Sequence, residues 1–166
     1  IDPVMLASSG QRLLDPEAMD TLIHELLPMA SLYTPNLDEG ACLLGTRKPT
    51  TRKEMREMAE RLLPRGQSPV LLKGGHLPGN ESPDVLVDKA DSSRWFGSRR
   101  LAAGNTHGTG CTLSAAIATN LALNNGDLAS AVTSAKCYIT KVLSAAELLH
   151  VGSGSRPLHH LVNLWH

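Results

Sequence analysis

Residues 105–116 read NTHGTGCTLSAA, and this stretch decides how the chain is interpreted. Gly108 and Gly110 allow backbone N–H groups to converge, and the small and apolar residues that follow favour a helix ending near residues 124–126. The N-terminus of a helix attracts anions, because its N–H groups and its dipole are directed outward. The stretch therefore predicts an anion-binding turn at the start of a helix.

Cys111 lies at the positive end of this predicted helix. That environment favours a thiolate, which suits the residue to accept a proton from an attacking hydroxyl group. In phosphoryl transfer, the N–H dipoles beside it would stabilise charge on the oxygens of the transferred group. The alternative is a glycine turn that starts an ordinary helix, with Cys111 as a small core residue. Taken alone, the four residues Gly108 to Cys111 favour that simpler interpretation.

Composition narrows the class of protein. The 166 residues, 42% hydrophobic and 19% charged, suit a single folded domain over residues 1–166. Sixteen basic residues balance sixteen acidic ones, which argues against nucleic acid or acidic lipid as a partner and favours a small molecule. No apolar stretch approaches the roughly 20 residues that span a bilayer. Three separated cysteines indicate reduced thiols and a cytoplasmic protein.

Helical and strand patterns alternate along the chain, joined by short connections. Helices are predicted over 15–27, 37–44, 51–63, from just after Gly110 to about 124, and from Asp127 to about 149, with Pro64, Gly66 and Pro69 ending the third. Buried strands are predicted over 30–34 and 70–72, and a β-pair over 84–88 and 95–101. This alternation predicts an α/β sandwich with a largely parallel sheet.

Residues 105–116 resemble the signature of the hydroxymethylpyrimidine/phosphomethylpyrimidine kinases, which are ribokinase-like enzymes of thiamine biosynthesis. Further blocks resemble the family in the family's order: DPVMLASSG (2–10), TPNLDE (34–39), LLKGGHL (71–77), SPDVL (82–86) and VGSGSRPLHH (151–160). The resemblance implies a ribokinase-like layered α/β/α sandwich with a mostly parallel central sheet. It also implies that the N-terminal part of that domain is missing from this chain.

The resemblance implies ATP- and Mg²⁺-dependent phosphorylation of 4-amino-5-hydroxymethyl-2-methylpyrimidine and its monophosphate. It implies Cys111 as the catalytic base, Gly108, Thr109 and Gly110 as the anion hole, Asn105 and Thr106 as nucleotide contacts, and a homodimer of the complete protein. Two alternatives stay open: pyridoxal kinase-like phosphorylation of vitamin B6, and a truncated nucleotide-binding domain without turnover.

Three residues are assigned to the nucleotide and its metal by the same resemblance. Asn36 and Glu39 match the Asn-x-x-Glu motif, whose carboxylate helps to hold Mg²⁺ beside the phosphates, and this spacing is also a helix-capping pattern. Lys73 follows an apolar strand and precedes two glycines, so that its ammonium group could reach an ATP phosphate. A solvated lysine at the end of a strand is the alternative.

The remaining assignments concern both ends of the chain. Asp2 resembles an aspartate near the metal and phosphates, and Val4 resembles a valine that touches the pyrimidine. Arg156 stands where the family has a glycine, which leaves nucleotide contact by residues 152–157 in question. The histidines near the C-terminus (His150, His159, His160 and His166) are interpreted as solvated side chains and not as a metal site.

Overall fold

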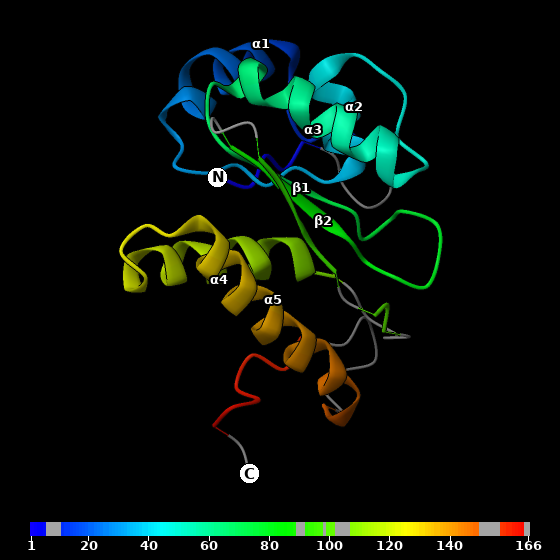
Figure 1. Cartoon of the computed structure of the whole chain (residues 1–166), viewed down its shortest axis with the longest axis vertical. Coiled ribbons are helices and arrows are strands. Elements are labelled where there is room, and N and C mark those ends of the chain that lie inside the picture. The colour runs from blue at the N-terminus through cyan, green and yellow to red at the C-terminus, as the bar shows by residue number, and fades with distance from the viewer. Residues whose placement is uncertain (6–10, 89–91, 98, 102–106, 150–156, 165–166) are drawn as a thin grey trace. The chain divides into compact units, whose positions relative to one another are not determined.

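The computed structural model describes residues 1–5, 11–88, 92–97, 99–101, 107–149 and 157–164 (Figure 1). The chain divides into two compact units, residues 1–97 and residues 98–166, and each is described by itself. The single domain expected from length stays a prediction.

The first unit opens with a helical segment that changes its pitch. Helix α1 (Pro16–Thr21) continues into a π-helical turn, η1 (Leu22–Leu26), and a 3-10 turn, η2 (Leu27–Met29). Asp15 occupies the N-cap position and Pro16 the first turn, as predicted, although the Asp15 side chain makes no capping hydrogen bond. Leu22, Ile23 and Leu27 are buried, so the apolar stripe fixes this segment to the core.

Helices α2 (Leu37–Leu44) and α3 (Arg52–Gly66) confirm two predicted helices. Thr51 caps α3 by accepting the Glu54 N–H, whereas the Glu54 carboxylate accepts the N–H of Thr50. The predicted end of α3 at Leu63 is too early, because the helix continues past Pro64 to Gly66, one of the three residues predicted to end it. A proline removes one helical hydrogen bond, and the buried face of α3, which includes Leu62, supplies enough packing to carry the helix past it.

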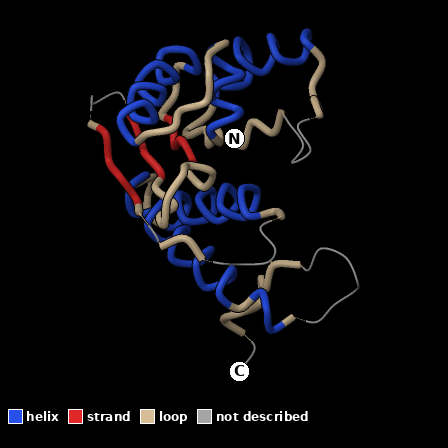
Figure 2. Tube along the Cα trace, turned by 90° about the vertical axis from the view of Figure 1, so that its right-hand side faces the viewer, coloured by secondary structure: helices blue, strands red, loops and turns tan. Residues whose placement is uncertain are grey.

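The named strands form one antiparallel sheet, in the order β1 (Val70–Lys73), β2 (Asp84–Val87) and β3 (Ser93–Phe96), and they lie side by side in Figure 2. The strand predicted over 70–72 and the first strand of the β-pair are confirmed, whereas the second strand of the pair lies earlier than the predicted 95–101. The mostly parallel sheet is not confirmed by these ladders. Parallel neighbours need a crossover, usually a helix, and the described residues between these strands form none.

Parallel pairing occurs on the other side of β1, in residues that form no regular strand. Isolated parallel bridges join Tyr33 to Val70 and Asn36 to Lys73. The Thr34 N–H in turn donates to the Ile1 carbonyl at 2.9 Å. The strand predicted over 30–34 is therefore irregular, since Pro35 has no N–H to continue a ladder, and it is buried only from Leu32 to Thr34.

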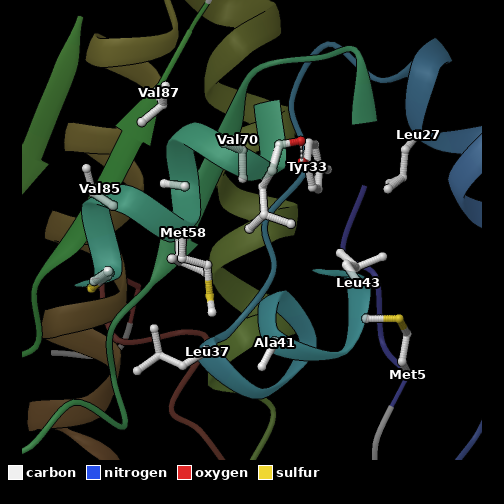
Figure 3. Close-up of a cluster of buried hydrophobic side chains, with 14 of the residues drawn as sticks. Met5, Leu27, Tyr33, Leu37, Ala41, Leu43, Met58, Val70, Val85 and Val87 are labelled. Carbon is white, nitrogen blue, oxygen red and sulfur yellow. Dashed lines mark hydrogen bonds between the residues drawn. The ribbon is translucent and has the colours of Figure 1, made fainter. Parts of the chain in front are cut away.

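The core of the first unit lies between the sheet and helices α2 and α3, which contact β1 (Figure 3). Tyr33 is fully buried, and its hydroxyl group donates to the Leu62 carbonyl at 2.6 Å. Burial raises the pKa of Tyr33, so the phenol stays neutral. The other fully buried large side chains of the unit are Met5, Leu27, Leu37, Met55, Leu62, Val70, Leu71, Leu72, Val85 and Val87.

The second unit is built on two helices in contact, α4 (Thr109–Leu123) and α5 (Leu128–Ser144), followed by the 3-10 turn η3 (Ala146–Leu148). Asp127 caps α5 as predicted, because its carboxylate accepts the N–H groups of Ala129 and Ser130. Apolar residues spaced along both helices are buried: Leu113, Ile117, Ala131, Val132, Ala135, Ile139 and Val142.

Candidate functional site

Lys73 is held at the end of β1 by residues from distant parts of the sequence. Its backbone N–H donates to the Pro35 carbonyl at 2.8 Å, and its ammonium group donates to Asp2 Oδ1 at 2.7 Å. The Lys73 side chain is only 12% exposed and that of Asp2 13%. The solvated lysine considered from the sequence is therefore wrong, because the ammonium lies in a nearly buried ion pair.

Thr34 completes the surroundings of Asp2. Its hydroxyl group donates to Asp2 Oδ1 at 3.2 Å, so one carboxylate oxygen accepts from both Thr34 and Lys73. Thr34 lies in residues 34–39, which resemble a family block, but the sequence pattern assigns it no role. Because residues 1–2, 32–36 and 70–73 run in the same direction here, Asp2, Thr34 and Lys73 meet at the carboxyl ends of adjacent segments. In α/β folds, ligands bind at such ends.

Asn36 and Glu39 form a complete capping box at the start of α2. The Asn36 side chain accepts the Glu39 N–H at 2.8 Å, and Glu39 Oε2 accepts the Asn36 N–H at 2.7 Å. The capping interpretation of this spacing is confirmed. Glu39 is also buried, at 3% exposure, which is unusual for a capping glutamate and leaves its metal-binding role open as a prediction.

The charge state of Glu39 depends on this burial. Burial raises the pKa of its carboxyl group above the ordinary value, whereas the Asn36 N–H and the Lys73 ammonium lower it, and the Asp2 and Asp38 carboxylates raise it. The charged form is therefore disfavoured, and a nearby cation would favour it.

Gly74 and Gly75 follow Lys73 and have different surroundings. A Cβ atom on Gly74 would lie 2.0 Å from the Pro83 carbonyl oxygen, so only glycine fits. A Cβ atom on Gly75 would meet Ser82 Oγ at 3.7 Å, an ordinary contact. The Gly74 N–H donates to Asp84 Oδ1 at 2.9 Å, and Asp84 is buried. Sequence reasoning placed Asp84 at the start of a strand and missed this contact, which depends on the pairing register.

The second unit holds the predicted catalytic turn. Gly108 is the N-cap of α4 with φ 82°, a left-handed conformation that favours glycine. Thr109, Gly110 and Cys111 form the first turn, and the Thr112 N–H donates to the Gly108 carbonyl at 2.9 Å. Cys111 is exposed, so the interpretation of this thiol as a core residue is wrong. Asn105 and Thr106 lie outside the described residues.

Other predicted residues have distinct environments. Val4, 42% exposed, lines a largely apolar groove of about 460 Å³ that Asp2 and Met29 also line. His159 is buried, so its interpretation as a solvated tail residue is wrong, whereas His160 is exposed. The remaining predicted tail residues (His150, residues 152–156 and His166) lie outside the described residues.

Two further properties concern the described part of the chain as a whole. No group of three or more His, Cys, Asp or Glu side chains there could hold a metal ion. Among the same residues, no helix combines the length and apolar character needed to cross a bilayer. A metal at Glu39 would thus need ligands from bound phosphate and water, which Mg²⁺ commonly uses.

Comparison with known proteins decides the family. The family model described as phosphomethylpyrimidine kinase matches residues 1–159. The chain belongs to this family. The hydroxymethylpyrimidine/phosphomethylpyrimidine kinase of Rhizobium meliloti (strain 1021) is 45% identical over 99% of this chain and 61% of its own length. The Thiamine biosynthesis bifunctional protein ThiED of Geobacter sulfurreducens is 45% identical over 98% of the chain and 32% of its own length. The resemblance predicted from the sequence motifs is confirmed.

Solved structures of similar kinases confirm the ribokinase-like fold. The Bacillus subtilis pyridoxal kinase in complex with ADP matches with a TM-score of 0.85 at 31% identity, covering 98% of this chain and 60% of that one. The phosphomethylpyrimidine kinase of Clostridium difficile 630 matches with a TM-score of 0.68 at 40% identity, covering 84% and 54%. This member of the phosphomethylpyrimidine kinase family thus spans about 61% of the length of kinases such as the Rhizobium meliloti one.

Proposed function

We propose that the protein to which these residues belong transfers the γ-phosphoryl group of ATP to the hydroxymethyl group of an aminopyrimidine alcohol, and then to the resulting monophosphate. The observation that carries the proposal is the family match over residues 1–159, which includes the Gly108–Cys111 turn at the start of α4. The Rhizobium meliloti relative, 45% identical over 99% of this chain, is named hydroxymethylpyrimidine/phosphomethylpyrimidine kinase.

The chemistry of the first step follows from the residues in the turn. The hydroxyl oxygen of the alcohol attacks the γ-phosphorus, the bond from that phosphorus to the β,γ-bridging oxygen breaks, and ADP leaves. The proton of the hydroxyl group goes to Cys111 Sγ, which is exposed in the first turn of α4. The N–H groups of the turn would stabilise the charge on the transferred group.

Lys73, Asp2 and Glu39 are proposed to arrange the nucleotide phosphates and Mg²⁺. The Lys73 ammonium lies at the end of β1, where a polyphosphate could replace Asp2 as its partner. Glu39 suits a cation because its Oε2 is already oriented by the Asn36 N–H, and a bound cation would stabilise the charged carboxylate that burial disfavours. Bound Mg²⁺ would neutralise charge on the phosphate oxygens. Val4 is proposed to contact the pyrimidine from the adjoining groove.

The test is a Cys111→Ala variant of the full-length protein, with Cys137→Ala as the matched control. Cys137 is also an exposed cysteine but lies on α5. Loss of a general base should lower kcat by about 100- to 10,000-fold. The control should retain the activity of the parent protein. A loss below about threefold in a folded Cys111→Ala protein would remove the thiol from the mechanism.

Pyridoxal is the second candidate acceptor, because the Bacillus subtilis pyridoxal kinase matches this chain with a TM-score of 0.85. Assays of ADP release with hydroxymethylpyrimidine and with pyridoxal separate the two acceptors by their kcat/KM values. We expect the pyrimidine to be preferred. Calorimetric ATP binding without ADP release from either alcohol would instead support a nucleotide-binding domain without turnover.

A further inference from the structure

Asp84 is a buried acidic residue to which the proposed reaction gives no role. It begins β2, where its Cα atom pairs with that of Lys73. The other three pairs of this ladder are entirely apolar: Val70–Val87, Leu71–Leu86 and Leu72–Val85. A polar group in such a place is unfavourable unless it is hydrogen-bonded. Asp84 is thus the acidic residue of this ladder, and it lies opposite Lys73, the residue assigned to phosphate.

One contact made by Asp84 fixes the backbone where the chain leaves β1. Its Oδ1 accepts the Gly74 N–H at 2.9 Å, in buried surroundings. The Pro83 carbonyl beside it leaves no room for a side chain on Gly74. The backbone directly after Lys73 is thus fixed from the β2 side by a hydrogen bond and by close packing.

Lys73 itself is fixed from the opposite side. Its N–H donates to the Pro35 carbonyl, and its ammonium group binds Asp2. Contacts from three separate segments therefore converge on one lysine and on the turn that follows it. A lysine side chain has several rotatable bonds, and holding both its backbone and its ammonium group restricts the conformations that remain open to it.

We propose that Asp84 is a positioning residue for nucleotide phosphate. By holding the Gly74 N–H, Asp84 sets the Lys73–Gly75 turn so that the ammonium group of Lys73 is presented to a polyphosphate. Asp84 itself does not touch the nucleotide. The inference rests on the proposed nucleotide role of Lys73.

The test measures the affinities of the full-length protein for ATP and for adenosine by calorimetry. The variants are Asp84→Asn and Asp84→Ala, with Asp88→Asn as the matched control just beyond the other end of β2. Loss of the bond that holds Gly74 should weaken the contact between Lys73 and phosphate by about the worth of one charge-assisted hydrogen bond, so we expect a Kd for ATP about tenfold higher in Asp84→Ala. Adenosine binding should stay within about twofold, because adenosine has no phosphate. Asp84→Asn should recover part of the ATP affinity, since its amide oxygen can still accept a hydrogen bond.

A double variant separates positioning from a general loss of structure. If Asp84 acts through Lys73, adding Asp84→Ala to Lys73→Ala should raise the Kd for ATP by no more than about twofold. The inference would be overturned if the losses of ATP affinity from Asp84→Ala and Lys73→Ala were additive in the double variant. It would also be overturned if Asp84→Ala lowered the affinities for ATP and adenosine equally. If Asp84→Ala does not fold, Asp84→Asn is used in the same comparison with an expected loss of about threefold.

Failure of the proposed function gives a different result. Lys73→Ala with unchanged ATP affinity would remove both the nucleotide role of Lys73 and the inference that depends on it. If Lys73→Ala lowers the affinity for ATP while a folded Asp84→Ala protein keeps the ATP affinity of the parent protein, only the inference about Asp84 is overturned.

Discussion

Replacing Gly74 by alanine should strongly destabilise the first unit, because the new Cβ atom would lie 2.0 Å from the Pro83 carbonyl oxygen. Contacts below 3.0 Å essentially never occur for real Cβ atoms, so the backbone must move. Overpacking of this kind costs about 1 to 3 kcal/mol. Movement also weakens the bond from the Gly74 N–H to Asp84, and an unsatisfied buried donor costs about 1 to 3 kcal/mol. We therefore expect the free energy of unfolding to fall by about 2 to 6 kcal/mol.

Gly75→Ala is the matched control, because it makes the same chemical change one residue later. Its Cβ atom would meet Ser82 Oγ at 3.7 Å, and Gly75 is not among the described glycines with positive φ. Such a substitution changes stability by less than about 1 kcal/mol, often favourably, since alanine restricts the unfolded chain.

Urea unfolding followed by circular dichroism and tryptophan fluorescence measures both variants. With an m-value of about 2 kcal/mol per molar urea, the Gly74→Ala midpoint should fall by about 1 to 3 M, and the Gly75→Ala midpoint by less than about 0.5 M. Equal midpoints for the two variants would refute the argument that Pro83 excludes a side chain at residue 74.

Three further predictions test single contacts. Since the pKa of Glu39 is raised in the fold, the folded protein binds a proton more tightly than the unfolded chain, and stability should fall as pH rises from about 4.5 toward the raised pKa. Urea midpoints measured across this pH range should show no such fall in Glu39→Gln. Midpoints that change with pH in the same way in the parent protein and in Glu39→Gln would contradict the assignment of this fall to Glu39. Asp2→Asn weakens the nearly buried pair with Lys73 and should lower the unfolding free energy by about 1 to 3 kcal/mol, whereas an unchanged thermal midpoint would show that the pair adds nothing. Tyr33→Phe removes the hydroxyl bond to the Leu62 carbonyl and should cost about 1 kcal/mol in the same denaturation assay, so a more stable variant would argue against that bond.

Features governed by neighbouring residues were predictable from the sequence. Asn36, Thr51 and Asp127 each cap the helix that follows, because an N-cap bond joins residues two or three positions apart. The left-handed glycine turn before Cys111 was predictable for the same reason. These rules located five helices to within a few residues.

Features that depend on distant partners were not predictable. Nothing beside Lys73 in the sequence indicates that its ammonium group binds Asp2, which is 71 residues away. The role of Asp84 requires the β1–β2 register, and the antiparallel order of the strands requires knowledge of which segments pair. The end of α3 was predicted too early because the penalty of the internal Pro64 was considered without the packing of the helix.

The two sides of β1 differ in a way that bears on the order of folding. On one side, β1, β2 and β3 follow one another within residues 70–96, so their pairing closes only short loops. On the other side, the bridges from Tyr33 and Asn36 and the ion pair from Asp2 close loops of 37 to 71 residues. Longer loops lose more entropy on closure, and contacts between distant residues form more slowly. We therefore expect the antiparallel sheet of β1, β2 and β3 to form early and the contacts around Lys73 to form late. The proposed phosphate-binding end would then be among the last parts of this unit to become ordered.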